Sequence, residues 1–203
     1  MNRFALGLLL MAYGSSAVAA DSDVRMRSQY GSENTDLQSV LYFEDIGYEK
    51  LTFSGRSLDG KDYAITVKEF VNGAPTKTEV VFDSKEDAYF KIKGEELAFR
   101  VLSQVTGANT VRFEFQFNGF RKRVEYPIAA GQKDFAMKDF LGDQPELPIP
   151  LGTDTHVLTY MLPYAKDDGS TQYCEVVQSG VRPEELGKKY AIPRYFLIAI
   201  KFQ

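Results

Sequence analysis

The chain contains few of the residue types that most often form catalytic or metal sites. Its 203 residues include one histidine, His156, and one cysteine, Cys174. A serine or cysteine nucleophile needs a neighbouring base, usually histidine, and no G-x-S-x-G motif occurs. A zinc site needs three or four His, Cys or carboxylate ligands, which one histidine and one cysteine do not supply. We predict no catalytic residue, no cofactor and no metal ligand. His156 is interpreted as a strand-start residue hydrogen-bonded to a loop, and Cys174 as a packed thiol on a buried strand.

Calcium requires only carboxylates and carbonyl groups, so three acidic segments need separate consideration. These are Asp167-Asp168-Gly169-Ser170, Asp59-Gly60-Lys61-Asp62 and Asp83-Ser84-Lys85-Glu86-Asp87. None has the alternating acids and closing glutamate of an EF-hand loop. Asp-Gly is common in hairpin turns, and aspartate commonly caps a short helix, so we interpret all three segments as turns.

Glycan chemistry is the remaining possibility. Glycoside hydrolysis needs two carboxylates at a set separation, and a sequence with 28 acidic residues cannot test that distance. Sugar-binding sandwiches usually stack pyranose rings on exposed tryptophan or tyrosine, and this chain has no tryptophan. We expect most tyrosines to pack in the core. The tyrosines considered are Tyr42, Tyr48, Tyr63, Tyr89, Tyr160 and Tyr164.

The first 20 residues have the pattern of a secretory signal peptide. Arg3 precedes the apolar stretch Phe4–Tyr13, and small residues then lead to Ala20. Cleavage is expected after Ala19 or Ala20, so the mature chain would begin at Ala20 or Asp21. No cysteine lies at the cleavage site for lipid attachment, and no later segment is apolar enough for a transmembrane helix. The predicted location is periplasmic or secreted.

The overall composition is that of an ordinary globular protein, with 44% hydrophobic and 26% charged residues. The net charge is −4, and removal of Arg3 with the signal peptide makes it 23 − 28 = −5. Because nucleic-acid binding needs a clustered basic surface, this charge balance argues against a nucleic-acid partner.

A period-two pattern of apolar and polar residues follows from about Val40 onward and predicts β-strands. Its clearest part is the hairpin Thr110–Tyr126, where Asn118-Gly119 predicts a two-residue type I′ turn. That turn sets the register of the two strands. The expected cross-strand pairs are Phe117–Phe120, Phe113–Val124, Val111–Tyr126, Glu114–Arg123 and Arg112–Glu125.

The basic run Arg121-Lys122-Arg123 lies in this hairpin and could form an anion-binding patch. The predicted register instead pairs Arg123 with the acidic Glu114 on the solvent face. We therefore interpret the run as part of a solvated hairpin surface with cross-strand partners.

Residues 21–142 are predicted to form an N-terminal β-sandwich unit. Similar hairpin patterns at 51–94 and 97–141 suggest an internal repeat of one β-meander, although any two hairpins with an Asn-Gly turn look alike. A proline-rich connection, 143–153, leads to a C-terminal β segment, 154–203, which is either separate or part of the same domain. This segment includes one short helix at 182–187 and a final apolar strand at 195–202.

The predicted fold is therefore an all-β antiparallel sandwich with one short helix near the C-terminus. The export signal, the length and the Asn-Gly and Asp-Gly hairpins resemble small exported β-rich proteins of gut Bacteroides-type bacteria. That family has no established activity, so the resemblance implies no site residue.

We expect an exported, non-enzymatic binding or assembly module of the cell envelope, with an envelope protein or a glycan as its partner. The alternative is a secreted glycan-acting hydrolase that uses a carboxylate pair. Paired acids in a deep cleft would favour the hydrolase, whereas an exposed apolar surface would favour the binding module.

Overall fold

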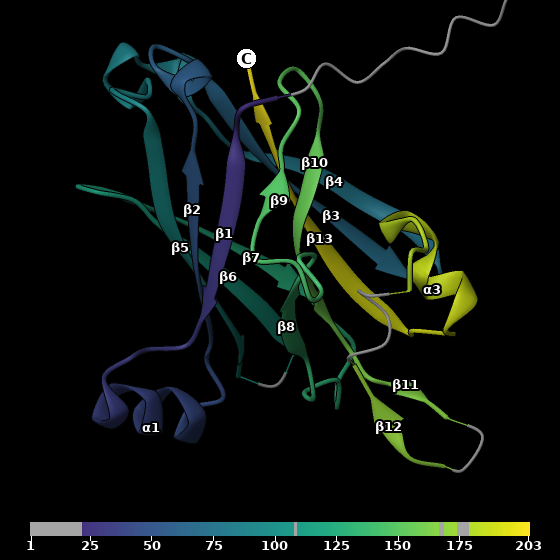
Figure 1. Ribbon diagram of the computed structural model, residues 1–203. Coiled ribbons are helices and arrows are strands. Elements are labelled where there is room, and N and C mark those ends of the chain that lie inside the picture. Colours follow the sequence, from purple (N-terminus) through teal and green to yellow (C-terminus); the bar gives the residue numbers. More distant parts are fainter. Residues whose placement is uncertain (1–21, 108, 167–168, 174–178) are drawn as a thin grey trace, which may run out of the picture.

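Alternating apolar and polar residues build two antiparallel β-sheets that pack face to face, which confirms the predicted all-β sandwich (Figure 1). The computed structural model describes residues 22–107, 109–166, 169–173 and 179–203. The predictions for the signal peptide, for Asp167 and Asp168 and for Cys174 therefore lie outside the described residues. No helix in the described part of the chain is long and apolar enough to cross a bilayer.

The first sheet has six strands. They are β1 (Arg25–Tyr30), β2 (Gly47–Ser54), β5 (Glu96–Thr106), β6 (Thr110–Gln116), β7 (Arg121–Pro127) and β9 (Leu147–Pro148). Their spatial order is β7-β6-β5-β2-β1-β9. The edge strand β9 comes from the predicted proline-rich connection and pairs Pro148 with Arg25. Because proline has no backbone N–H to donate, an edge position suits it.

The second sheet has five strands. They are β3 (Tyr63–Val71), β4 (Ala74–Asp83), β8 (Ala136–Asp139), β10 (Thr155–Met161) and β13 (Arg194–Phe202). Their order is β4-β3-β13-β10-β8, so the last strand of the chain lies in the middle of the sheet. Two short strands, β11 (Tyr164–Ala165) and β12 (Thr171–Gln172), pair with each other separately.

Short helices occupy the connections. They are α1 (Thr35–Phe43), η1 (Arg56–Leu58), η2 (Ser84–Glu86), η3 (Ala88–Phe90), η4 (Pro183–Glu185) and α3 (Leu186–Lys189). The predicted C-terminal helix is confirmed by η4 and α3, with Pro183 at its start. It continues to Lys189 and does not stop at Gly187, which lies inside the helix and packs closely against Gly73.

The helix α1 corrects the prediction that the period-two pattern begins near Val40. Its first turn is capped by Asn34, whose side chain accepts a hydrogen bond of 2.9 Å from the Leu37 N–H. An asparagine cap before a run without glycine or proline is a normal helix start. The next strand, β2, begins only at Gly47.

Aromatic side chains from both sheets form the core between them. The Phe113 ring on β6 contacts Tyr160 on β10 and Phe196 on β13, at centroid distances of 5.5 and 5.4 Å. Phe53 on β2 meets Phe202 on β13 at 5.4 Å. These are edge-to-face contacts, which stabilise a core beyond simple area burial. The two sheets are thus joined along β13.

The β6–β7 hairpin has the predicted register. Val111 pairs with Tyr126, Phe113 with Val124 and Glu114 with Arg123. Phe113 and Phe115 are fully buried. The turn differs from the predicted type I′, because Gly119 has φ 92° while Asn118 does not have a positive φ. Type I′ requires positive φ at both residues, a condition that Asn72 and Gly73 meet between β3 and β4.

The cross-strand pairing expected for the basic run is confirmed, although Glu114 is only 9% exposed and does not lie on the solvent face as predicted. The Arg123 guanidinium lies 2.6 Å from the Glu114 carboxylate, and Arg121 lies 3.7 Å from it. Arg112 pairs with Glu125 at 2.8 Å on the same surface. Cross-strand acids therefore partner two of the three basic residues, so the run does not present an unopposed positive patch.

The proposed sequence segments occupy different positions in the sheets. Segment 51–94 leaves the first sheet after β2 and places β3 and β4 in the second, whereas 97–141 keeps β5, β6 and β7 in the first sheet and places only β8 in the second. The internal repeat is thus not a repeat of sheet position, and as a sequence duplication it stays a prediction. Segment 154–203 provides β10 and β13 and shares the core with the N-terminal strands.

A second apolar cluster covers the other face of β13. Tyr195 and Leu197 pack there with Phe70 and with Leu186 of α3. The approach of α3 is close because two glycines meet: a Cβ added to Gly187 would lie 2.9 Å from the Gly73 Cα. Real Cβ atoms do not approach backbone so closely. This contact explains a glycine inside α3.

Replacement Gly187→Ala is expected to lower the free energy of unfolding by about 1–3 kcal/mol, because the new methyl group would clash with the β3–β4 turn and with Tyr195. Urea denaturation of the mature chain measures the change. Lys189→Ala, on the exposed side of the same helix, should change stability by less than about 0.5 kcal/mol. Equal effects of the two substitutions would show that the glycine contact is not the cause.

Candidate functional site

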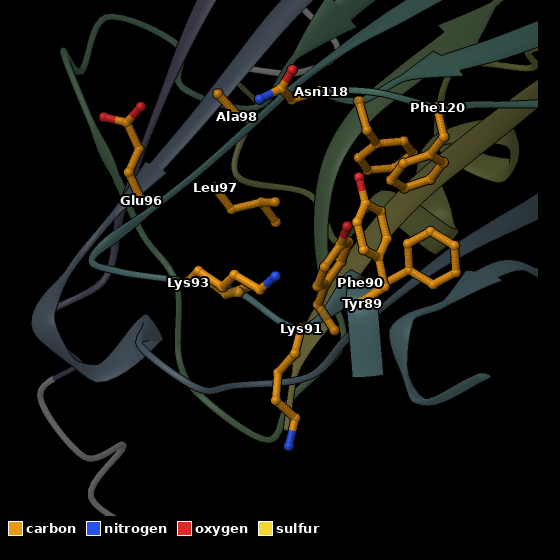
Figure 2. A pocket seen from close by; sticks show the side chains of 12 residues that line it. Tyr89, Phe90, Lys91, Lys93, Glu96, Leu97, Ala98, Asn118 and Phe120 are labelled. Atoms are coloured by element: carbon orange, nitrogen blue, oxygen red, sulfur yellow. The ribbon is translucent and has the colours of Figure 1, made fainter. Parts of the chain in front are cut away.

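A cavity lies at one end of the sandwich, where β5 begins. We call it the aromatic pocket; its volume is about 430 Å³ (Figure 2). Four separate parts of the chain form it: the start of β3, η3 with the loop after it, the start of β5, and the β6–β7 turn. The lining residues are Tyr63, Tyr89, Phe90, Lys91, Ile92, Lys93, Glu96, Leu97, Ala98, Phe117, Asn118 and Phe120.

Short polar contacts fix the loop that carries most of these residues. The Asp87 side chain caps η3 by accepting a hydrogen bond of 2.8 Å from the Tyr89 N–H. Ile92 exchanges backbone hydrogen bonds with the 60–61 turn, and its side chain is buried. The Asp59 carboxylate accepts a 2.7 Å bond from the Gly94 N–H. Because side chains and backbone both anchor the loop, the pocket is already formed without a ligand.

The back wall of the pocket is a stack of phenylalanine rings. Phe117 and Phe120 face each other across the β6–β7 turn, with ring centroids 4.4 Å apart and planes within 9°. Phe90 of η3 adds to this stack at 4.7 Å from Phe120. Phe82 lies behind all three, at 5.1–5.3 Å. These contacts join η3 to the hairpin and give the pocket an apolar, rigid wall.

Tyr89 and Lys93 stand at the mouth of the pocket. The Tyr89 side chain is 62% exposed, although its neighbour Phe90 is packed into the wall. The Lys93 ammonium lies 5.4 Å from the centre of the Tyr89 ring. Figure 2 shows Lys93 reaching across the pocket toward the aromatic rings, while Lys91 points away from them.

The two lysines differ in their charge partners. Lys91 lies 3.5 Å from the Asp62 carboxylate. Among the residues that the structure describes, no carboxylate lies within 4 Å of the Lys93 ammonium. Lys93 is therefore a positive charge held beside an aromatic ring, free to meet an anionic or hydroxyl-bearing ligand.

Hydrolytic chemistry has little support in this pocket. Glu96 is the one acidic residue in its lining, and His156 is not part of it. Retaining and inverting glycosidases both need two carboxyl groups flanking the scissile bond. The pocket has the aromatic wall and the few polar groups typical of a binding site, without the acid pair.

The predicted tyrosine packing is confirmed for Tyr63, Tyr160 and Tyr164, which are at most 5% exposed. Burial raises the pKa of the Tyr63 hydroxyl well above its usual range, so it stays protonated. Two tyrosines depart from that expectation: Tyr89 and Tyr42 are exposed by 62% and 61%. They lie at opposite ends of the sandwich, so they belong to different surfaces.

His156 lies on β10, as expected for a strand residue, but the predicted hydrogen bond to a loop is not formed by its Nε2 atom. That atom is buried and lies 3.5 Å from the Glu184 carboxylate. Burial lowers the pKa of His156, and Glu184 opposes this effect.

The acidic segments that the structure describes act as turns. Asp83 and Asp87 cap η2 and η3 by accepting hydrogen bonds from Lys85 and Tyr89 N–H groups. Asp59 accepts the hydrogen bond from the Gly94 N–H. Asp62 accepts a hydrogen bond of 3.1 Å from the Ser84 hydroxyl and pairs with the Lys91 ammonium. Within the described ranges, no group of three or more His, Cys, Asp or Glu side chains is placed to hold a metal ion.

Glu49 is a buried carboxyl that the sequence analysis missed. Glu49 on β2 is 1% exposed and follows the same strand face as the core residues Leu51 and Phe53. Ser28 on β1 donates a hydrogen bond to it. Burial raises the pKa of Glu49 from its ordinary 4.5 to about 7, and the negative charge of Asp139 contributes. Glu49 lies near the other end of β2, away from the aromatic pocket.

Comparisons of this chain with protein-family models, with curated proteins and with solved structures gave no significant match.

Replacement Glu49→Gln is expected to stabilise the protein at pH 8 by about 1–3 kcal/mol and to have little effect near pH 4.5. Because the folded-state pKa is raised, the folded chain holds this proton more tightly than the unfolded chain does. The stability that the protonated Glu49 contributes to the parent chain is therefore present below pH 4.5 and is lost as the pH rises through 7. The glutamine, which does not ionise, does not lose it. Urea denaturation at both pH values measures the difference.

The matched control is Glu146→Gln, which removes a more exposed carboxylate that pairs with Arg27. Its effect should stay below about 1 kcal/mol at either pH. A Glu49→Gln effect of the same size at pH 4.5 and pH 8 would contradict the raised pKa.

Proposed function

We propose that this protein is an exported, non-enzymatic binding module of the bacterial cell envelope that holds a glycan in the aromatic pocket. The observation that carries the proposal is the combination of a rigid phenylalanine wall, the exposed Tyr89 and Lys93, which has no carboxylate partner among the described residues, around a cavity of about 430 Å³. A cavity of this size matches the range found for small-molecule sites.

A sugar ring has the shape and polarity that this pocket accepts. One face of a pyranose presents C–H groups, which pack against aromatic rings, while its edge presents hydroxyl groups. The phenylalanine wall and Tyr89 offer the apolar surface, and Asn118 and Glu96 lie in the lining where hydroxyl groups can hydrogen-bond. Figure 2 shows Glu96 across the pocket from the aromatic rings and Asn118 at its upper edge.

Lys93 supports a preference for acidic sugars. Its ammonium has no carboxylate within 4 Å among the described residues and faces the aromatic side of the pocket. A uronic-acid carboxylate placed there would gain a charge-assisted hydrogen bond without breaking an existing ion pair. A neutral sugar would gain only an ordinary hydrogen bond, so uronic-acid glycans are the favoured ligands.

The hydrolase alternative has one observation in its favour, the raised pKa of Glu49, since a general acid needs such a shift. This carboxyl is 1% exposed, accepts a hydrogen bond from Ser28, and does not line the aromatic pocket. A buried acid at the far end of β2 cannot reach a sugar bound beside Tyr89. The geometry therefore favours binding over hydrolysis.

Export and envelope location belong to the same proposal. They are supported by the pattern of Arg3, the apolar stretch 4–13 and the small residues up to Ala20. The layout that resembles small exported proteins of Bacteroides-type bacteria agrees with it. An exported module of this kind would meet envelope or dietary polysaccharides directly.

Replacement Tyr89→Ala is expected to weaken glycan binding by at least about 10-fold, because it removes the exposed ring at the pocket mouth. The measurement is calorimetric titration of the mature chain with oligogalacturonate, alginate oligomers, xylo-oligosaccharide and cello-oligosaccharide. Tyr42→Ala is the matched control, since Tyr42 has almost the same exposure at the opposite end of the sandwich. It should leave the affinity unchanged.

Lys93→Met tests the preference for acidic sugars. It keeps the aliphatic length of the side chain and removes the charge, so it should weaken oligogalacturonate binding by about 5–10-fold and neutral-sugar binding much less. Absence of binding to all four oligosaccharides, or binding that Tyr89→Ala leaves intact, would overturn the proposed function.

Secretion of the full chain from a bacterial host should give a mature protein that begins at Ala20 or Asp21. Intact-mass measurement of the periplasmic fraction checks the cleavage position. A variant with Leu8→Arg and Leu9→Arg, which interrupts the apolar stretch, should remain uncleaved in the cytoplasm. Recovery of the unaltered full-length chain from the periplasm would contradict a cleaved signal.

A further inference from the structure

The exposed apolar side chains of this protein gather at α1, at the end of the sandwich away from the aromatic pocket. Seven large hydrophobic residues are exposed in the described part of the chain, and five of them lie on α1 or at the adjoining end of β1. Scattered exposed hydrophobic residues are normal, whereas a cluster of them marks an interaction surface. The five are Tyr30, Leu37, Val40, Tyr42 and Phe43.

Three of these residues form a continuous stripe along the helix. Leu37, Val40 and Phe43 follow one another at intervals of three, which places them on one side of α1. They are 46%, 56% and 85% exposed. We call these three residues the α1 stripe. Figure 1 shows α1 projecting beyond the ends of the sheets.

The helix is held rigidly although one side of it faces solvent. Asn34 caps its first turn, and the Gln38 side chain accepts a hydrogen bond of 2.6 Å from the Ser32 N–H. Leu41, one turn after Leu37, is buried and fixes the helix against the sandwich. A hollow of about 170 Å³ lies beside the helix, between Tyr30, Tyr42 and the core residue Tyr160. The chain thus presents a fixed apolar ridge with a depression next to it.

The charges around the stripe indicate what covers it. Residues 31–49 contain five acidic residues and no lysine, arginine or histidine. Four of these acids, Glu33, Asp36, Glu44 and Asp45, are exposed around the helix. The hollow has one lysine in its lining, Lys138 of β8, on the sandwich side. The outer rim of the α1 stripe is therefore acidic.

This rim distinguishes among three kinds of occupant. A second copy of the chain would bring two acidic rims together, which costs binding energy through like-charge repulsion. An anionic lipid surface would repel the same carboxylates. A protein with an apolar groove bordered by lysine and arginine would bury the stripe and pair with the rim.

We propose that α1 is a docking helix that inserts Leu37, Val40 and Phe43 into an apolar groove with a basic border on a partner protein of the cell envelope. This interaction is independent of glycan binding, because it uses the other end of the sandwich. The partner is defined by its groove and its border charge. Proteins that bind a helix in an apolar groove contact side chains spaced three or four residues apart along that helix.

The test uses a photo-reactive benzophenone amino acid in place of Phe43, or in place of Val80 as a control, in the full chain produced in its native host. Val80 is 59% exposed on β4, in the sheet's edge strand. A protein adduct at position 43 that is absent at position 80 identifies the partner. The purified partner is then titrated with the mature chain.

The affinity for the partner is expected to fall by at least about 30-fold in Phe43→Asp or Val40→Asp and to be unchanged in Val80→Asp. Reversal of the rim charge by Glu44→Lys should weaken it by about 3-fold or more, and a rise from about 50 to about 500 mM NaCl should weaken it as well. All substituted residues are exposed, so each variant should keep the melting temperature of the parent within a few degrees.

Three results would overturn the proposal. The first is an adduct with a second copy of the chain, with a dimer in sedimentation analysis that Phe43→Asp dissociates. The second is Phe43-dependent binding to vesicles of phosphatidylethanolamine and phosphatidylglycerol without a protein partner. The third is no protein adduct at position 43 above that at position 80. The affinity of Phe43→Asp for oligogalacturonate should match that of the parent chain. This titration separates a failure of the docking proposal from a failure of the glycan pocket.

Discussion

Burial of β13 on both faces is the constraint on which the rest of the structure depends. Phe196, Ile198 and Phe202 point into the core between the sheets, while Tyr195 and Leu197 point toward α3 and the second cluster. A strand covered on both sides must have neighbours for all its backbone groups, and β3 and β10 supply them along its length. The N-terminal strands therefore complete their sheet only when the last strand of the chain is in place.

Local features could be predicted from the sequence because a few neighbouring residues determine them. The register of β6 and β7 follows from a two-residue turn and from alternation of phenylalanine with charged residues. The position of β13 in the middle of a sheet could not be predicted in this way, since β3 and β13 are joined by pairing across more than a hundred residues. The helix α1 was missed because its exposed apolar residues do not show the inward-facing stripe of a packed helix.

The candidate site shows the same division between local and distant information. The aspartate caps around η3 were recognisable as turns, but the pocket forms only where that loop meets the β6–β7 turn and the start of β5. Tyr89 is exposed, whereas Tyr63, which lines the same pocket, is buried. A hint was present in Tyr89-Phe90 followed by Lys91 and Lys93, an aromatic and basic run outside any strand. Glu49 could have been predicted as buried from its alternation with Leu51 and Phe53.

The two proposed binding surfaces are separated by the length of the sheet. In the β2–β5 pair, Ser54 meets Glu96 at the pocket end, and Gly47 meets Ser103 at the end near α1. Eight strand residues span roughly 25 Å at about 3.3 Å each. In the part of the chain that the structure describes, the β2 and β5 strands between the two ends are paired along their length and their core side chains are buried, which makes a rigid connection. Occupation of one surface should therefore leave the other unchanged, and the module would link a glycan to a protein simply by binding both at once.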